Sequence, residues 1–475
     1  MSIVTPGVLP ASALLQGGRP AWLERWGAFA ADLRFADLPD AAVERTRLVL
    51  LDSIGAIAAG MQEPEMRALV RRAASGTGAG EGTPAIGAGH AFPPANAAFL
   101  NGTAGTMLEL DEGNQYARGH PGIHVIPAAL AFAGRAGAAG RDLLVAIALG
   151  YEIGARIGIA SKLRVTMHPH GTWGTVGAAL AVAKLDGADA ERMVETLNVA
   201  STLGLATSRR TMLEGGTVRN AYAGFSNQLG LMAYDLVLSG FVGETDGIGT
   251  IYDTVIAERF EPEAMVADLG TRWEIARNYF KRHAACRYTH GALDALSDIV
   301  RQHGGPLDPA AVDAVEVDTY VWAAQLDSPE PKNMLAAKFS LPFALATAIV
   351  NGGATVPAFR DPARTDAATR DLARRVAVRE DPALTALLPG LRPARLRVRL
   401  KDGSAFAAEA LTNKGDTEDP YTADEVRAKF RELAEPVWGA AHAGRILAAV
   451  DAIEGGSLRE LDRLLAQPPQ QEFRP

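Results

Sequence analysis

The sequence predicts a mainly α fold, in which a large all-helical domain carries a smaller, inserted α+β domain. Three observations lead to this prediction. Alanine-rich segments with apolar residues at helical spacing fill most of the chain before residue 260, and period-two alternation appears only later, at 311–320 and 394–400. The length of 475 residues exceeds one ordinary hydrophobic core. We expect the helical domain to comprise 1–267 and 406–475, and the α+β domain to comprise 268–405.

Glycine and proline residues divide the helical pattern into separate elements. The spacing Gly150-x3-Gly154-x3-Gly158 within one of them indicates close helix packing, and no glycine-rich cofactor loop follows a strand. Thr422 and Glu425 form a capping box at the start of a final helix, 422–433. The helices predicted before this one are 22–33, 40–60, 94–110, 125–160, 172–206, 220–240, 289–303 and 337–351.

The two alternating segments, 311–320 and 394–400, are predicted to be strands of an antiparallel sheet, and Lys401-Asp-Gly is predicted to be the hairpin turn after the second. The part of the chain before residue 260 shows no convincing strand pattern. We therefore expect that part to be all-α.

Composition narrows the class of protein. The chain is 48% hydrophobic and 21% charged, as in a soluble globular enzyme, and its net charge of -8 argues against a nucleic-acid surface. The single cysteine, Cys286, excludes an internal disulfide framework and a four-cysteine cluster. Neither a signal-peptide pattern nor an apolar span of 18 residues is expected, so we predict a cytoplasmic protein without membrane contact.

The segment from Glu109 to Pro127 is the most informative part of the chain. It lies between two helical segments, and its glycines and prolines predict a loop. A loop with both proton acceptors and proton donors is typical of an acid/base site, the alternative being a solvated connection. Its ionisable residues are Glu109, Asp111, Glu112, Arg118, His120 and His124.

A second histidine pair, His168 and His170, precedes an apolar helix. A neutral imidazole there is a candidate general base, and a helix start near Thr172 would suit a substrate carboxylate. The alternative is that both histidines only cap a tight turn. Histidine pairs also suggest zinc, but Pro121-Gly122 interrupts a helical face between His120 and His124, and we expect no metal.

Further candidates lie in the segment 280–290 and near Gly216. Lys281 and Cys286 are candidate bases, whereas Arg219 is a candidate clamp for a carboxylate. The alternatives are a solvated charged face and a buried small cysteine. Arg287 and His290 complete this group as candidate substrate-binding residues.

Several ordered motifs make the chain resemble the MmgE/PrpD family over nearly its whole length. The resemblance implies a large helical domain with an α+β lid, a homodimer and no cofactor. The family includes 2-methylcitrate dehydratases, cis-aconitate decarboxylases and iminodisuccinate epimerases. The motifs are Leu51-Asp-Ser-Ile-Gly, Asn101-Gly-Thr-Ala, the loop ending His120-Pro-Gly, His168-Pro, Gly216-Thr-Val-Arg, Lys281 to His290, Gly415-Asp-Thr-Glu-Asp-Pro and Val426-x-x-Lys429-Phe430.

The resemblance also implies roles for single residues. His120 and His168 would be the two active-site histidines, Lys281 the lysine of the lid segment and Tyr320 a tyrosine facing the site. Arg219 would replace a family lysine, and the acidic positions would be Glu109, Asp111 and Glu112. The acidic loop departs from the family pattern Asp-Phe-Asp-Asp-Thr, because it reads Glu-Leu-Asp-Glu-Gly-Asn and lacks the threonine.

These features predict proton abstraction next to a carboxylate of a small di- or tricarboxylate, without a cofactor. Arg219, Lys281 and Arg287 would stabilise the developing enediolate, and a lid would exclude water. We expect an epimerase of an iminodisuccinate-like diacid, with His168 or Lys281 as one base and His120, Tyr320 or Cys286 on the opposite face. The alternatives are a 2-methylcitrate-type dehydratase and a binding protein that keeps only the fold.

Overall fold

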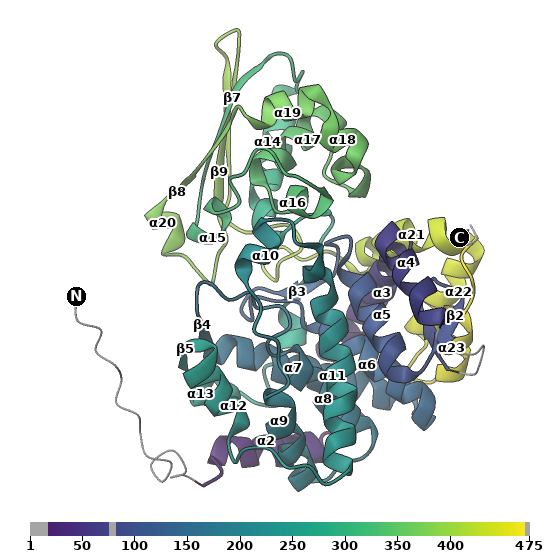
Figure 1. Ribbon diagram of the computed structural model, residues 1–475. Helices are drawn as coiled ribbons and strands as arrows, with labels where there is room; N and C mark the ends of the chain where they lie inside the picture. Colours follow the sequence, from purple (N-terminus) through teal and green to yellow (C-terminus); the bar gives the residue numbers. More distant parts are fainter. Residues whose placement is uncertain (1–17, 76–81, 471–475) are drawn as a thin grey trace.

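The structure is a computed structural model that describes residues 18–75 and 82–470. Figure 1 shows a large helical body and a smaller α+β part that stands on it. The mainly α prediction is confirmed, because helices form most of the described chain. The longer helices of the body are α2 (Ala21–Asp32), α3 (Asp40–Gly60), α4 (Pro64–Ala74), α5 (Pro94–Thr106), α6 (Pro121–Ala136), α7 (Gly140–Ala160), α8 (Gly174–Leu185), α9 (Ala190–Ser201) and α11 (Ala221–Leu238).

Two of the predicted helices are each divided by a glycine. The range 125–160 holds α6 and α7, and Gly137 ends α6 in a left-handed conformation with φ 66°. The range 172–206 holds α8 and α9, with Gly187 at φ 74° between them. By contrast, the prediction of 40–60 agrees with α3 at both ends.

The core of the body lies around α8, which packs against α6, α7, α9 and α11. Gly150 on α7 and Gly177 on α8 allow the two backbones to approach closely, since a Cβ on Gly150 would lie 2.5 Å from the Gly177 carbonyl oxygen. The glycine spacing therefore does serve helix packing.

Helix α7 contradicts the expectation that the chain has no long apolar span. By length and composition this helix could cross a membrane, but 94% of its most apolar window is buried. The burial accounts for its composition, which is that of a core helix. Its two buried charges, Glu152 and Arg156, form an ion pair of 2.6 Å within the helix.

Short strands correct the expectation of an all-α first part. They pair as small antiparallel ladders, which are too short to give a period-two pattern in the sequence. One ladder, β3 with β6, connects the acidic loop to the segment before Lys281. These strands are β1 (Thr83–Ala85), β2 (His90–Phe92), β3 (Gly113–Asn114), β4 (Ser161–Leu163), β5 (Ala257–Phe260) and β6 (Asn278–Tyr279).

The α+β part contains one four-stranded sheet in the order β10-β9-β7-β8. The predicted antiparallel pair is confirmed as β7 (Val312–Thr319) and β9 (Ala394–Leu400). Strand β8 (Val376–Glu380) was not predicted, and it runs parallel to β7. The hairpin turn after β9 leads into β10 (Ala405–Ala410), so the sheet extends past the predicted boundary at 405.

Helices pack beside this sheet. Helix α14 (His290–His303) contacts β9 and β10, and α17 (Leu341–Asn351) contacts β8. Alternate residues of β9 are buried, which gives the sheet one packed and one open face. The shorter helices here are α15 (Val321–Ala324), α16 (Met334–Lys338), α18 (Asp361–Thr365), α19 (Ala367–Ala373) and α20 (Pro382–Thr385).

After the sheet the chain returns to the body. Helix α21 (Ala423–Trp438) packs against α3, and the predicted capping box is present, since Thr422 and Glu425 bond each other's backbone N–H. Helices α22 (Ala440–Asp451) and α23 (Leu458–Leu465) follow. The short helices of the body include η1 (Phe35–Asp37), α10 (Arg209–Leu213), η2 (Thr217–Asn220), α12 (Gly247–Gly249), η3 (Thr250–Val255), α13 (Pro262–Val266) and η4 (Glu274–Arg277).

Candidate active site

The acidic loop is shorter than predicted. It ends at His120, because α6 begins at Pro121 and runs through Pro127. Proline suits the first position of a helix, where its missing N–H has no partner in any case. Pro121-Gly122 therefore begins a helix where a break was expected, and His124 lies in the first turn of α6. His120 is the N-cap residue with φ -126° and ψ 71°, so it lies outside the helix.

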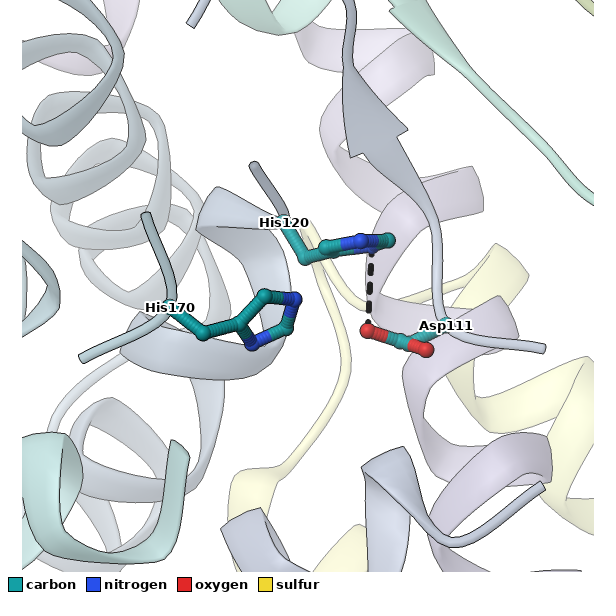
Figure 2. A group of neighbouring side chains, drawn as sticks. All are labelled: Asp111, His120 and His170. Atoms are coloured by element: carbon teal, nitrogen blue, oxygen red, sulfur yellow. Dashed lines mark ion pairs between the residues drawn. The ribbon is translucent and has the colours of Figure 1, made fainter. Parts of the chain in front are cut away.

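The loop brings an imidazole, a carboxylate and an ammonium group together. Nδ1 of His120 lies 3.1 Å from Oδ2 of Asp111, and the dashed line in Figure 2 marks this pair. Oδ1 of Asp111 lies 3.4 Å from Nζ of Lys281. Nζ of Lys281 is also 3.7 Å from Oε2 of Glu109, which pairs with Arg219. All these side chains are buried, and each charged one has a partner of opposite sign, which a buried charge needs.

His170 lies at the centre of the histidine cluster. Its ring centroid is 4.5 Å from that of His120 and 4.9 Å from that of His168, and Figure 2 shows the rings of His170 and His120 side by side. Nη2 of Arg219 donates to its Nε2 at 3.2 Å, and its Nδ1 lies 3.2 Å from Nε2 of His124. Since arginine only donates, the neutral His170 ring carries its proton on Nδ1 and donates it to His124.

The two other pocket histidines hold opposite tautomers. Nδ1 of His120 is 2.6 Å from the Glu112 carbonyl oxygen, which only accepts, so Nδ1 carries the proton and Nε2 is a free acceptor. Nδ1 of His168 accepts from the His170 backbone N–H at 3.0 Å, so Nε2 carries the proton. His120 is thus placed as a base, and His168 as a hydrogen-bond donor.

Burial keeps these imidazoles neutral. It lowers the pKa of His120 well below its ordinary value, assisted by the Lys281 charge, and lowers that of His168 and His170 well below theirs, assisted by Arg219. Burial also lowers the pKa of His124 to about 3. A protonated imidazole in this cluster therefore needs a new negative charge beside it.

Glu112 has a different role from the other carboxylates of the loop. Its Oε1 accepts from the Gly122 N–H at 2.7 Å, and its Oε2 accepts from the Tyr151 hydroxyl at 3.0 Å. Burial raises the pKa of Glu112 to about 8, so it is mainly protonated at neutral pH. Glu112 ties the loop to α6 and α7 and does not line the pocket.

A pocket with an empty volume of about 500 Å³, partly open to solvent, lies beside the histidines. Three lining arginines, Arg118, Arg209 and Arg392, form no ion pair within 18–75 and 82–470. Nε and Nη2 of Arg209 and Nε of Arg392 are buried and have no hydrogen-bond partner among these residues. Arg118 and Arg392 also donate to backbone carbonyls, of Gly158 at 2.9 Å and of Gln115 at 2.7 Å, but none of the three has a carboxylate partner among these residues. Guanidinium groups without a carboxylate partner are suited to bind those of a substrate.

The structure brings most of the predicted site residues to this pocket. His120, His168, Glu109, Arg219, Arg287 and Cys286 line it. Asp111, Glu112 and Lys281 lie one layer behind the wall. Arg219 and Arg287 already hold Glu109 and Asp416, so neither is a free clamp, and burial raises the pKa of Cys286 to about 11, which makes it a poor base.

Two further predicted residues, Tyr320 and His290, do not line the pocket either. Tyr320 packs edge-on against Tyr288 at 5.8 Å, and it is Tyr288, together with Tyr279, that faces the pocket. His290 bonds Arg287 at 3.0 Å and is buried. His170 and Arg118 lie in segments that were predicted to carry the site, but neither was among the predicted site residues. Nothing in the sequence indicated Arg209, Arg392, Tyr279 or Tyr288.

Asp111, His120 and His170 are the described residues that come closest to a metal site, since one ligand atom from each lies within 4.8 Å of the others. Their contacts fit a proton-transfer network better. Nε2 of His170 accepts from Arg219, and Lys281 lies beside Asp111. The positive charges of Arg219 and Lys281 would therefore repel a metal cation bound between these residues.

The fold and the site together define a mainly helical enzyme with paired histidines and unpaired arginines in one pocket. Residues 24–250 match the MmgE/PrpD N-terminal domain, and residues 283–454 match the MmgE/PrpD C-terminal domain. The chain therefore belongs to the MmgE/PrpD family, as its motifs predicted.

Curated relatives of the chain are named cis-aconitate decarboxylase. One from Aspergillus terreus is 25% identical over 439 residues, covering 86% of this chain and 88% of its own length. Those from Mus musculus and Homo sapiens are 25% and 26% identical and cover 80% and 72% of this chain, and 80% and 73% of their own lengths. These relatives give no support to the predicted epimerase, and the lyase alternative fits them better.

Proposed function

We propose that this protein is a lyase that acts on a small tricarboxylate and releases CO2 from it. The observation that carries the proposal is the placement of His120, with Asp111 behind it, in a pocket lined by unpaired arginines. The relatives from Aspergillus terreus, Mus musculus and Homo sapiens are named cis-aconitate decarboxylase, and these names support loss of CO2 as the reaction. They also make cis-aconitate the first compound to test.

Substrate binding is the task of the arginines. Arg209 lies on the His168 side of the pocket, since its backbone N–H donates to the Thr166 carbonyl at 2.8 Å and the His168 N–H donates to the Thr207 carbonyl at 3.0 Å. Arg392 lies on the side of Tyr279 and Tyr288. Two carboxylates bound at these places would hold the carbon chain across the histidine cluster. Each charged hydrogen bond of this kind contributes about 1.5–3 kcal/mol.

Proton transfer is the task of His120. When CO2 leaves, the carbon–carbon bond breaks, its electron pair stays on the carbon skeleton, and one proton must be added to carbon. Bound carboxylates bring negative charge next to His120, which favours its protonated form. The Glu112 carbonyl oxygen accepts from Nδ1, and Asp111 lies 3.1 Å from the same nitrogen, so the proton on Nε2 faces the substrate. His168 donates a hydrogen bond to the developing charge. Solvent then returns the proton to His120.

The test is to incubate the purified protein with cis-aconitate in D2O. We expect CO2 release with one deuterium on carbon for each CO2. The His120→Asn variant should lose a factor of about 10²–10⁴ in kcat. The control is His303→Asn, which changes an exposed histidine of α14 and should keep full activity.

Other products would overturn the proposal in distinct ways. An alkene formed with loss of water from a 2-methylcitrate-type substrate, without CO2 from any tricarboxylate, would make the protein a dehydratase. Deuterium uptake into a diacid without loss of CO2 or water would instead restore the epimerase expected from the sequence. No reaction with any di- or tricarboxylate would leave a binding protein.

A further inference from the structure

The rear side of the acidic loop is held by a buried lysine from the last part of the chain. Nζ of Lys429, on α21, donates to the Leu110 carbonyl oxygen at 2.6 Å. The same Nζ forms an ion pair of 2.6 Å with Oδ1 of Asp52, on α3. Lys429 is 3% exposed and Asp52 is 1% exposed, so this pair lies in the interior of the body.

Neither member of the pair touches the reaction pocket. The pocket is lined by other residues, and Asp52 and Lys429 lie behind the loop. Both occur in sequence motifs, Leu51-Asp-Ser-Ile-Gly and Val426-x-x-Lys429-Phe430, to which the proposed chemistry gives no role. A buried ion pair is a weak source of stability, because removing both charges from water costs about as much as the pair returns. The pair can instead contribute by fixing the position of the backbone that it contacts.

The Leu110 carbonyl oxygen, which accepts from Lys429, belongs to the residue between two carboxylates of the site. Leu110 separates Glu109 from Asp111, the carboxylates that lie 3.7 and 3.4 Å from Nζ of Lys281. Oδ2 of Asp111 lies 3.1 Å from Nδ1 of His120, and the carbonyl of the next residue, Glu112, accepts from that nitrogen at 2.6 Å. A second buried lysine, Lys338 on α16, donates to the Met107 carbonyl oxygen at 2.9 Å. Two lysines thus fix the loop backbone on either side of Glu109.

We propose that Asp52 and Lys429 are positioning residues that fix the Leu110 backbone and thereby the alignment of Asp111 with His120. The chemistry expected from this alignment rests on the proposed function. A displacement of about 1 Å at a reacting group costs about 10²-fold in rate, so a loosened loop lowers kcat, while the arginines still bind the substrate.

The experiment compares Lys429→Met, Asp52→Leu and the double variant. Each single variant leaves one uncompensated buried charge and should lower the urea midpoint strongly. The double variant removes both charges, so most of the lost midpoint should return. Its kcat should stay about 10- to 100-fold below that of the wild type with KM changed by less than about threefold, because the Leu110 carbonyl still lacks its donor.

The matched control is Lys184→Met. Lys184 also donates to backbone carbonyls, those of Ala30 and Ala31 at 2.8 Å, but it lies far from the loop at the end of α8. This variant should lose some stability and keep its kcat. Recovery of kcat together with stability in the double variant would overturn the positioning role.

A second readout separates this inference from the proposed function. If the wild type turns over no tricarboxylate, the proposed function fails, and hydrogen exchange of the loop amides tests the positioning role alone. Faster exchange at 107–113 in the double variant than in the wild type, with exchange in α7 unchanged, supports it. Equal exchange in that segment refutes it.

Discussion

Substitutions of Arg209 and of its neighbour Arg210 allow substrate binding to be tested separately from folding, because only Arg209 lines the pocket. Arg209 lines the pocket with unpaired buried nitrogens, whereas Arg210 is exposed and pairs with Glu214. We predict that Arg209→Gln raises KM about 10- to 100-fold with little change in kcat, since it removes a charged hydrogen bond made in both ground and transition states. Arg210→Gln should leave both constants unchanged. Steady-state kinetics check this, and a lower kcat with unchanged KM for Arg209→Gln would contradict it.

At the residue scale, the sequence predicted the ionisable groups better than their partners. His120, His168 and Lys281 were selected because histidines and charges near turns stand out in a linear reading. That Arg219 is neutralised by Glu109, 110 positions away, is a property of the folded chain alone. Arg392 carried no local signal, because it follows an ordinary turn before β9.

At the element scale, the packing of α7 on α8 depends on glycine. A Cβ on Gly150 would lie 2.5 Å from the Gly177 carbonyl oxygen and 2.7 Å from Cγ1 of Val125. We predict that Gly150→Ala lowers the free energy of unfolding by about 1–3 kcal/mol or more, because the Gly177 carbonyl could move away only if the backbone of α8 shifted. Urea denaturation measures this.

The matched control for that prediction is Gly444→Ala in α22. No atom lies within 4 Å of a Cβ at Gly444. Alanine is favoured over glycine in a helix interior by about 1 kcal/mol, so this variant should be equally or more stable than the wild type. A destabilisation equal to that of Gly150→Ala would show that contact distance is not the cause.

Elements with long periodic patterns were predictable, and those fixed by distant pairing were not. Helix α3 and the pair β7–β9 followed directly from apolar spacing. Strand β8 has its alternation spread over only five residues and gains its place by parallel pairing with β7. The early start of α6 was missed because Pro121 was interpreted as a break, when proline also begins helices.

At the scale of the whole molecule, Glu112 links stability to pH. Its pKa is raised by burial from 4.5 to about 8, so between these pH values the folded protein retains a proton that the unfolded chain releases. Stability from this group therefore falls as pH rises through that window. We predict that Glu112→Gln, which mimics the protonated form, gains stability relative to the wild type by up to about 1.4 kcal/mol per pH unit. Urea denaturation of both proteins at pH 5 and pH 8 checks this, and a constant difference would contradict it.

The lysines behind the acidic loop also set the order in which the site is completed. Their partners precede them by 170 residues for Lys281, 231 for Lys338 and 319 for Lys429. On the ribosome, the loop carboxylates therefore emerge long before any of these cations, and domains begin to fold from the N-terminal side. The Leu110 carbonyl gains its buried donor only when α21, the latest of these elements to be synthesised, docks on α3.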